Sequence, residues 1–194
     1  MIGILNIGFG NIKSVKNCIS ISRQKKEKII YIENKKDIKD CRRIVIPGHG
    51  FFKNVINKLK KIEMINSILD LKKKTLGICI GLQMFGLFNS EGNTNGFGLI
   101  SENVENFENK KEREVPNMGW REVEIIKKNR FIKKNLSFYF AHSYFIRPCS
   151  ETFGITKGMN FFSSFIIKKN IVLTQFHPEK SGSNGINFIK NFLK

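Results

Sequence analysis

The sequence has few cysteines, prolines and tryptophans, and it has no long uncharged apolar run. Its 194 residues include 4 cysteines, 4 prolines and 1 tryptophan. The cysteines are scattered without the C-x-x-C spacing of metal sites, so we expect reduced thiols rather than a disulfide framework. No segment approaches the about 20 apolar residues of a membrane-spanning helix, and Met1 leads directly into strand-like residues 2–7 rather than a signal peptide. We therefore predict a cytoplasmic protein that does not associate with membranes.

Acidic residues are also scarce. The chain has 16 Asp and Glu against 34 Lys and Arg, which gives a formal net charge of +18. A basic surface is the first signature of nucleic-acid binding. Most of the excess is lysine, however, distributed along the chain in pairs and one triplet, and no basic recognition helix or basic strand with interleaved aromatic residues occurs. We expect a solvated lysine surface with weak attraction to polyanions, and no nucleic-acid partner.

The length and the 41% of hydrophobic residues are sufficient for one domain with a full core, which we place at residues 1–194. In the first half, short β-branched runs alternate with apolar residues at helical spacing. The predicted strands are residues 2–7, 29–32, 43–46 and 76–80. The predicted helices are residues 12–21 and 55–71, the second broken near Glu63. This alternation favours a parallel sheet with helices on both faces.

The second half has short apolar stretches separated by turns, which favours antiparallel strands. They lie near residues 104–107, 123–126, 138–140, 161–167 and 171–175. A final helix is predicted over residues 186–193, with Ser183 or Asn184 as its N-cap, and residues 89–96 form the loop with the strongest sequence signal for mobility. The predicted fold class is α/β, with an open, mixed, mainly parallel sheet flanked by helices and antiparallel strands in the second half.

Cys79 lies between Gly77 and Gly81 in a G-x-C-x-G motif that follows a predicted strand. Glycines allow the close backbone approach of a tight turn, and a strand-to-helix turn presents a nucleophile in the same way as the G-x-S-x-G motif. Free amides at the start of the next helix favour an anion, which activates a thiol and stabilises an oxyanion. A cysteine in an apolar run is more often a small buried hydrophobe. That is our expectation for Cys18, Cys41 and Cys149.

Glycine-containing turns follow three of the predicted strands, at residues 8–11 (GFGN), 47–50 (PGHG) and 79–81 (CIG). Binding sites in open parallel sheets lie beyond the carboxyl ends of the strands. We therefore expect one pocket to draw on all three turns, although α/β turns often use glycine for structural reasons alone.

A nucleophilic cysteine needs a base and a group that orients the base. His177 follows a predicted strand in the sequence Q-F-H-P-E. Pro178 biases His177 towards an extended conformation, in which residues i and i+2 point to the same side, so Glu179 can reach the imidazole. An H-P-E sequence alone is more often a strand end followed by a solvated glutamate. Together with the motif around Cys79 it predicts a Cys-His-Glu triad.

These motifs, residues 77–83 (GICIGLQ) and 177–179 (HPE), resemble the class I, or triad, glutamine amidotransferase family. Within that family, residues 116–120 (PNMGW), 139–144 (YFAHSY) and 175–181 (QFHPEKS) resemble the glutaminase subunits of imidazole glycerol phosphate synthases. The match runs in order over essentially the whole chain. The resemblance implies glutamine hydrolysis without a metal or cofactor: Cys79 attacks the side-chain amide, His177 passes a proton to the departing ammonia, and Glu179 orients His177.

The resemblance further implies where the substrate binds. The oxyanion would be held by backbone N–H groups of Ile80 and of one residue in the 48–50 turn. L-glutamine would be bound by Gln83 and by the backbone of Ser143 and Tyr144. The implied substrate-binding residues are Gln83, Gly48, His49, Gly50, Ile80, Ser143 and Tyr144.

The implied partner is a cyclase subunit with a (β/α)₈ barrel, in a heterodimer. The barrel would use the ammonia to form imidazole glycerol phosphate and an aminoimidazole carboxamide ribotide in histidine biosynthesis. Positions that match the family's subunit interface are Asn11, Trp120, Tyr139 and Lys180.

Three residues depart from the family pattern. His49 replaces a small apolar residue, Asn117 a histidine and Arg121 an asparagine, which puts the formation of the oxyanion hole and the coupling to the partner in question. Two alternatives stay open: a paralogous glutaminase that supplies ammonia to another synthase, such as a sugar amidotransferase, and a non-catalytic scaffold of the same fold. The intact triad argues against the scaffold.

Overall fold

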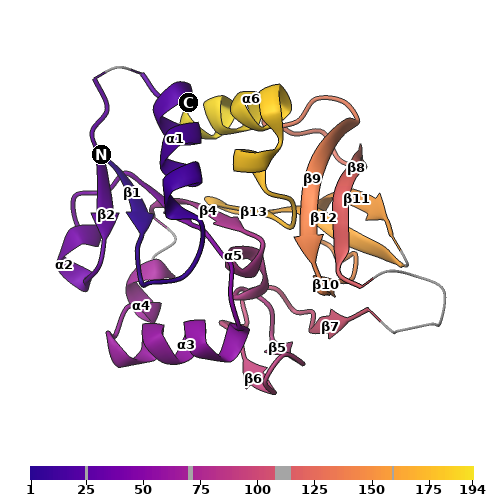
Figure 1. The fold of residues 1–194 in the computed structure, drawn as a ribbon, viewed down its shortest axis with the longest axis horizontal. Helices are drawn as coiled ribbons and strands as arrows, with labels where there is room; N and C mark the ends of the chain where they lie inside the picture. The colour runs from indigo at the N-terminus through magenta and orange to yellow at the C-terminus, as the bar shows by residue number, and fades with distance from the viewer. Residues whose placement is uncertain (25, 70–71, 108–114, 159) are drawn as a thin grey trace.

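A mixed β-sheet runs through the middle of the molecule (Figure 1). The computed structural model describes residues 1–24, 26–69, 72–107, 115–158 and 160–194. The parallel part of the sheet consists, in spatial order, of β2 (Ile29–Ile32), β1 (Ile2–Leu5), β3 (Arg43–Ile46), β4 (Lys74–Ile78) and β13 (Ile171–Thr174). It continues in antiparallel register through β12 (Phe161–Lys168), β11 (Thr152–Lys157), β8 (Asn117–Ile125) and β9 (Leu136–His142).

A second, smaller sheet lies below the carboxyl ends of the main strands (Figure 1). Its order is β10 (Tyr144–Ile146), β7 (Val104–Asn106), β5 (Phe88–Asn89) and β6 (Thr94–Asn95). The loop predicted at residues 89–96 thus contains a short hairpin, because β5 pairs with β6.

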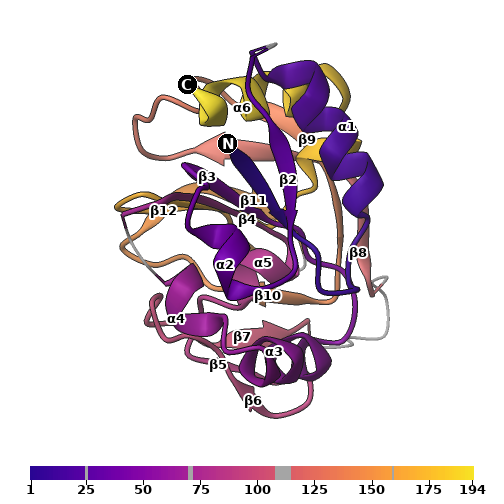
Figure 2. The same cartoon turned by 90° about the vertical axis from the view of Figure 1, so that its left-hand side faces the viewer.

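Helices cover both faces of the main sheet, as Figures 1 and 2 show. One face carries α1 (Ile12–Ser22) and α6 (Gly182–Leu193). The other carries α2 (Lys35–Ile38), α3 (Phe52–Lys61), α4 (Ile65–Ile68) and α5 (Ile80–Gln83). Strand side chains alternate between two cores: Ile2 and Ile4 pack with α1 and α6, and Leu5 packs with α3. The predicted fold class is confirmed.

Predicted elements of the first half agree closely with the observed ones. The bounds of β2 and β3 are those predicted, and the predicted long helix is interrupted near Glu63, where the backbone has φ 52° between α3 and α4. Residues 70–71 at the end of that prediction lie outside the described residues. A single positive φ ends the helix because it reverses the local backbone twist.

Three predictions in the second half are wrong, one in strand pairing and two in bounds. The strand predicted at residues 171–175 is antiparallel only to β12, because β13 pairs in parallel with β4. Strand β8 begins at Asn117, six residues before the predicted stretch. The sequence pattern missed these six residues because most of them are exposed and show no apolar alternation. Helix α6 begins at Gly182 with Ser181 as N-cap, not Ser183 or Asn184. Its first turn packs tightly, because a Cβ on Gly185 would lie less than 3.0 Å from the Pro178 carbonyl. Large apolar residues therefore appear only later in the helix, which is why the sequence pattern placed its start too late.

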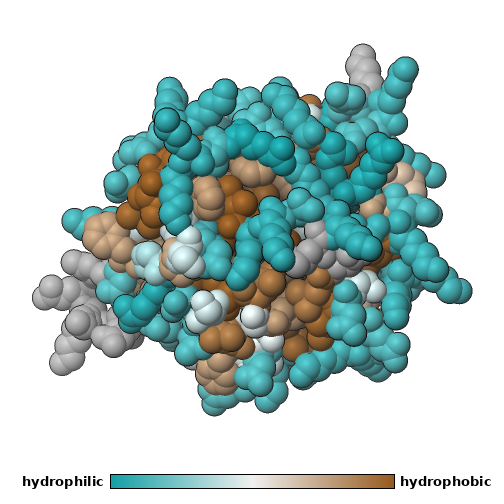
Figure 3. All heavy atoms as spheres, turned by 180° about the vertical axis from the view of Figure 1, so that it is seen from behind, coloured by the Kyte–Doolittle hydropathy of each residue, from teal (hydrophilic) through white to brown (hydrophobic). Residues whose placement is uncertain are grey.

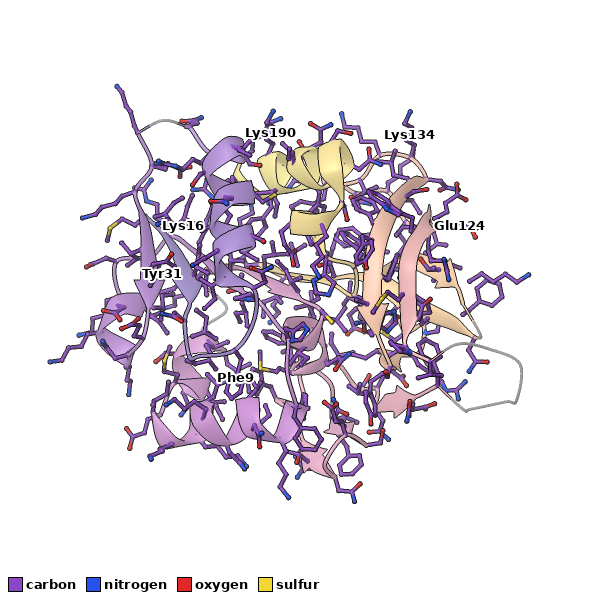
Figure 4. All side chains as sticks on the ribbon, in the orientation of Figure 1. Phe9, Lys16, Tyr31, Glu124, Lys134 and Lys190 are labelled. Atoms are coloured by element: carbon purple, nitrogen blue, oxygen red, sulfur yellow. The ribbon has the colours of Figure 1, made fainter. Side chains whose placement is uncertain are left out.

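The surface in Figure 3 is mostly hydrophilic, with apolar side chains showing in patches. Lysines are distributed over it: Lys16, Lys134 and Lys190 lie on separate parts of the surface in Figure 4, and Lys16 Nζ sits 5.2 Å from the ring centroid of Tyr31. In the described part of the chain, no helix combines the length and apolar character that membrane crossing requires.

Candidate active site

Cys79 sits in the turn between β4 and α5, at the carboxyl end of the sheet. The backbone of Cys79 has φ 55° and ψ −107°, and the residue is buried, with 5% of its surface exposed. A positive φ is uncommon in residues other than glycine and recurs at functional sites. The Cys79 N–H donates to the Thr174 carbonyl at 2.7 Å, which ties the turn to β13. The predicted strand-to-helix turn is therefore present.

Glycines around Cys79 are required by close backbone contacts. A Cβ on Gly77 would lie less than 3.0 Å from the Gly81 carbonyl, and a Cβ on Gly81 would lie less than 3.0 Å from the Ile46 carbonyl. A Cβ on Gly48 would lie 2.5 Å from the Gly81 nitrogen. The turns after β3 and β4 are consequently packed backbone against backbone. This confirms the reason for the glycines that the sequence indicated.

The helix expected after Cys79 is the single turn α5, Ile80–Gln83. A single turn has a small macrodipole. The N–H groups of its first residues lack acceptors within the helix, so these amides, rather than the helix dipole, are what an anion beside Cys79 would meet.

His177 and Glu179 are hydrogen-bonded, with Nδ1 and Oε1 2.8 Å apart and both side chains buried. The contact is as expected, but the backbone differs. His177 is extended, whereas Glu179 lies in the 3₁₀ turn η1 (Pro178–Lys180). The turn is held by the Ser181 hydroxyl, which donates to the His177 carbonyl at 2.6 Å. The His177 N–H donates to the Tyr139 carbonyl at 2.8 Å, so η1 also fixes the base against β9.

The charge state of His177 follows from its neighbours. Burial lowers its pKa, but the charge and hydrogen bond of Cys79 and those of Glu179 outweigh burial and raise the pKa to about 10. His177 is therefore a cation at neutral pH. It lies between a sulfur that accepts its proton and a carboxylate that stabilises its charge.

A cavity of about 350 Å³ opens in front of Cys79. Its lining comes from the turns after β3 and β4, the hairpin loop, and the ends of β8 and β9. These residues are Gly48, His49, Gly50, Cys79, Ile80, Gln83, Glu91, Pro116, Met118, Ala141, His142, Ser143 and Tyr144. Every residue predicted to bind substrate lies in this lining.

The turn at residues 8–11 does not line the cavity, contrary to prediction. Instead it supports the 47–50 turn from behind: a Cβ on Gly50 would meet the ring of Phe9 at 3.2 Å, and one on Gly10 would meet Pro47 at 3.4 Å. Figure 4 shows Phe9 in the segment between β1 and α1.

Gln83 and Tyr144 are joined across the cavity wall. Gln83 Nε2 donates to the Tyr144 carbonyl at 3.0 Å, and Asn89 Nδ2 lies 3.5 Å from Gln83 Oε1. The Ser143 carbonyl accepts from the Phe107 N–H at 3.0 Å. Both carbonyls of this backbone segment therefore already have a hydrogen-bond donor within the protein.

Sequence reasoning missed Glu91, which lines the same cavity. Its Oε2 accepts from the Phe52 N–H at 2.7 Å, and burial raises its pKa. Glu91 stands in a polar loop without a motif, so only the tertiary structure shows that it faces Cys79.

Three of the four residues predicted at a subunit interface gather on one exposed surface. Trp120 and Tyr139 meet edge to face with centroids 6.3 Å apart, and Lys180 Nζ lies 5.6 Å from the Tyr139 ring. Met118 and Trp120 are 56% and 52% exposed. We call Met118, Trp120, Tyr139 and Lys180 the docking face. Asn11 instead caps α1, accepting from the Ser14 N–H at 3.2 Å.

A family model described as "Glutamine amidotransferase class-I" matches residues 4–194. The chain belongs to the class I glutamine amidotransferase family. This confirms the resemblance seen in the sequence.

Among relatives of this glutamine amidotransferase is the "Imidazole glycerol phosphate synthase subunit HisH" of Methanocaldococcus jannaschii, with 36% identity over 100% of this chain and 99% of the relative. The protein of the same name from Prochlorococcus marinus subsp. pastoris is 34% identical, over 100% and 97%. A solved structure titled "Crystal structure of glutamine amidotransferase" superposes with a TM-score of 0.74 at 13% identity, covering 99% of this chain and 96% of that one. This last match supports the fold alone.

The residues that depart from the glutamine amidotransferase pattern have distinct surroundings. His49 is exposed at the cavity rim. The Arg121 guanidinium donates to the Trp120 carbonyl at 3.0 Å. Asn117 is buried, with Nδ2 2.9 Å from His142 Nε2, and His142 Nδ1 lies 2.8 Å from the Tyr144 carbonyl. Burial lowers the pKa of His142 to about 3, so it is neutral and bridges β8 to the cavity wall.

Proposed function

We propose that this protein is the glutaminase subunit of an imidazole glycerol phosphate synthase. It hydrolyses glutamine and delivers the ammonia to a cyclase subunit, a (β/α)₈ barrel, which forms imidazole glycerol phosphate and an aminoimidazole carboxamide ribotide. We place this activity in the cytoplasm.

The observation that carries the proposal is the buried His177–Glu179 pair, 2.8 Å apart, coupled in charge to Cys79 at the wall of a substrate-sized cavity. The histidine-pathway assignment draws on the relatives named for that synthase, which match the whole chain.

In the first half of the proposed reaction, the Cys79 sulfur attacks the side-chain carbon of glutamine. The carbonyl π pair moves onto oxygen, and the oxyanion lies against the N–H of Ile80 and an N–H of the 48–50 turn. His177 then gives its proton to the departing nitrogen, the C–N bond breaks, and ammonia leaves a thioester on Cys79. Glu179 stabilises the cationic form of His177 that makes this transfer efficient.

In the second half, neutral His177 takes a proton from water as the water attacks the thioester. The C–S bond breaks with its electron pair on sulfur, glutamate leaves, and the thiolate and imidazolium are restored. No redox partner is needed, because carbon keeps its oxidation state throughout.

Glu91 and Gln83 suit the polar ends of the substrate. Glutamine carries an α-ammonium group, and Glu91 supplies a carboxylate in the cavity lining. Gln83 lies beside it, oriented by Tyr144 and Asn89. We assign the ammonium to Glu91 and the positioning of the substrate backbone to Gln83.

The docking face suits the barrel partner. The exposed Trp120 lies next to Tyr139, whose ring contacts the Lys180 ammonium group. Aromatic residues are enriched at protein–protein interfaces. Met118 belongs to both the docking face and the cavity lining, so ammonia released at Cys79 has a short route to a partner docked there.

Reconstitution tests the proposal. The chain is mixed with a cyclase barrel subunit, the cyclase's substrate and glutamine, and glutamate and imidazole glycerol phosphate are followed together. We expect the two products to form in equal amounts. In the matched control, Cys79→Ala forms neither from glutamine, while added ammonium salt restores imidazole glycerol phosphate.

Two other outcomes would redirect the assignment. Glutamate without the coupled product would indicate a glutaminase for another synthase. Neither product from the wild-type pair, with the barrel active on ammonium salt, would indicate a scaffold.

A further inference from the structure

Gln175 is a buried amide whose side chain contacts the sulfur of the nucleophile. It follows β13 directly and has no solvent exposure, and its Nε2 lies 3.6 Å from Cys79 Sγ. The separation suits an N–H donor and a sulfur acceptor, because sulfur is larger than oxygen. The triad motif does not include this residue, and the cavity lining does not either.

Backbone hydrogen bonds fix the two residues relative to each other. The Cys79 N–H donates to the carbonyl of Thr174, the neighbour of Gln175, at 2.7 Å, and the Gln175 N–H donates to the Ser164 carbonyl at 3.0 Å. Strands β4 and β13 pair in parallel up to this point, with Thr174 opposite Ile78. The amide is therefore held against the sulfur by the sheet itself.

The other end of this amide is unused. Gln175 Oε1 is buried and has no hydrogen-bond partner in the described part of the chain. Gln83, the other buried glutamine of the site, uses both ends, donating to Tyr144 and accepting from Asn89. A buried amide with an unpaired oxygen costs free energy that an apolar residue of similar size would avoid. The contact with sulfur explains why a donor stands here.

Two histidines of the described residues lie at the site around the sulfur, in different charge states. His177 faces it as a cation, with Glu179 behind the imidazole, and the nearby His142 is neutral. The Ala141 carbonyl, 3.9 Å from Sγ, accepts only from a thiol. The neutral N–H donor of Gln175, which follows the neighbouring strand β13, therefore adds to the stabilisation of the Cys79 thiolate and does not compete with the sulfur for the proton of His177.

We propose that Gln175 donates a hydrogen bond to the Cys79 thiolate, stabilising it before attack and again when it leaves the thioester. The bond weakens while the sulfur is acylated and re-forms as the C–S electron pair returns to sulfur. The catalytic part of this inference rests on the proposed function; the contact with the thiolate does not.

Alkylation of Cys79 tests the thiolate directly, without glutamine or partner. The rate of modification by iodoacetamide is measured from pH 5 to 10, with the Cys79 peptide quantified by mass spectrometry. In Gln175→Leu we expect the pH midpoint to rise by about one unit, which lowers the rate at the wild-type midpoint by about fivefold. Gln175→Glu, which places an anion at the sulfur, should move the midpoint further in the same direction.

Ser164→Ala is the matched control. It removes the buried Ser164 hydroxyl, which donates to Thr156 Oγ1 at 2.6 Å on the strands next to Gln175, without touching the sulfur. Its midpoint should equal that of wild type even if its thermal stability falls. Should Gln175→Leu fail to fold, Gln175→Met provides the same test with a flexible side chain.

A folded Gln175→Leu or Gln175→Met protein with the wild-type midpoint would overturn the proposal, and so would an equal shift in Ser164→Ala. Failure of the proposed function is distinguishable. In that case the midpoint shifts as expected, but wild type releases no glutamate with the cyclase partner.

Discussion

The proposed nucleophile and the proposed base are positioned by different means. In the parallel half, Cys79 is held by backbone packed on backbone, with Gly48, Gly77 and Gly81 at contacts that leave no room for a Cβ. His177 follows β13, where the parallel strands meet the antiparallel ones, and it is held by neighbouring side chains and by the Tyr139 carbonyl of β9. Phe138 stacks on Phe176 with centroids 4.1 Å apart.

The difference has a physical reason. A nucleophile in a strained turn needs a backbone that cannot relax, and glycine contacts provide this. A base needs a fixed ring and a stabilised charge, which packing and Glu179 supply. The antiparallel half also presents the proposed docking face.

The largest expected effect is on the nucleophile. Cys79→Ala should lower partner-stimulated glutamate release by at least about ten-thousandfold, because no other group in the cavity lining forms the thioester. Circular dichroism and affinity for the barrel should match wild type, since the docking face is untouched. Glutamate release at the wild-type rate would place the nucleophile elsewhere.

Glu179→Gln isolates the contribution of the group that orients the proposed base. Glutamate release should fall by about a hundredfold, because the neutral amide stabilises imidazolium poorly. The pKa of His177, measured by NMR titration of its ring protons, should fall below its value of about 10. An unchanged titration would show that Glu179 does not set the charge of His177.

The same pair predicts a pH dependence of stability. Because the folded-state pKa of His177 is raised, its stabilising contribution is complete below its unfolded pKa of about 6.5 and is lost as pH rises towards about 10. In Glu179→Gln the loss should occur at lower pH. Urea denaturation at several pH values measures both curves.

Paired substitutions test whether the two halves differ in tolerance. Gly81→Ala should cost about 2 kcal/mol or more of unfolding free energy, because its Cβ meets the Ile46 carbonyl. Phe138→Leu should cost about 1 to 2 kcal/mol and retain activity, since an apolar side chain still packs against Phe176. Gly81 does not have a positive φ, so the cost of Gly81→Ala arises from the contact with the Ile46 carbonyl alone. Equal tolerance at Gly81 and Phe138 would remove the distinction.

The smallest effect is expected at the docking face. Trp120→Ala should weaken binding to the barrel about tenfold, with unfolding free energy within about 0.5 kcal/mol of wild type, because the residue is half exposed. Phe161→Ala, equally exposed at 51% on β12, is the control and should bind as wild type. Equal weakening in both variants would argue against a localised docking face.

The parallel half was the easier to predict from sequence. Strands β2 and β3 are short β-branched runs with polar ends. The Cys79 turn is a local motif, and its glycines indicate that the backbone segments there are closely packed. The His177–Glu179 contact is local too. Its 3₁₀ backbone was not predicted, because the turn depends on Ser181 and on packing against α6.

The antiparallel half depends on distant contacts. Strand β8 gives little apolar alternation because much of it is exposed, and the two-residue strands of the small sheet are too short to show a period. Glu91 and Gln175 reach the site only through tertiary structure, from a loop and from the end of β13. Gln175 belongs to the motif around His177, but nothing in that motif shows that its amide reaches Cys79, and Glu91 belongs to no motif.

In the proposed reaction, Cys79 carries the acyl intermediate of glutamine hydrolysis. Acid quenching during steady-state turnover with the barrel partner, followed by peptide mass spectrometry, measures this directly. A glutamyl adduct on the Cys79 peptide, absent from the peptides of Cys18, Cys41 and Cys149, is the predicted result. An adduct on another residue, while glutamate accumulates, would contradict the account.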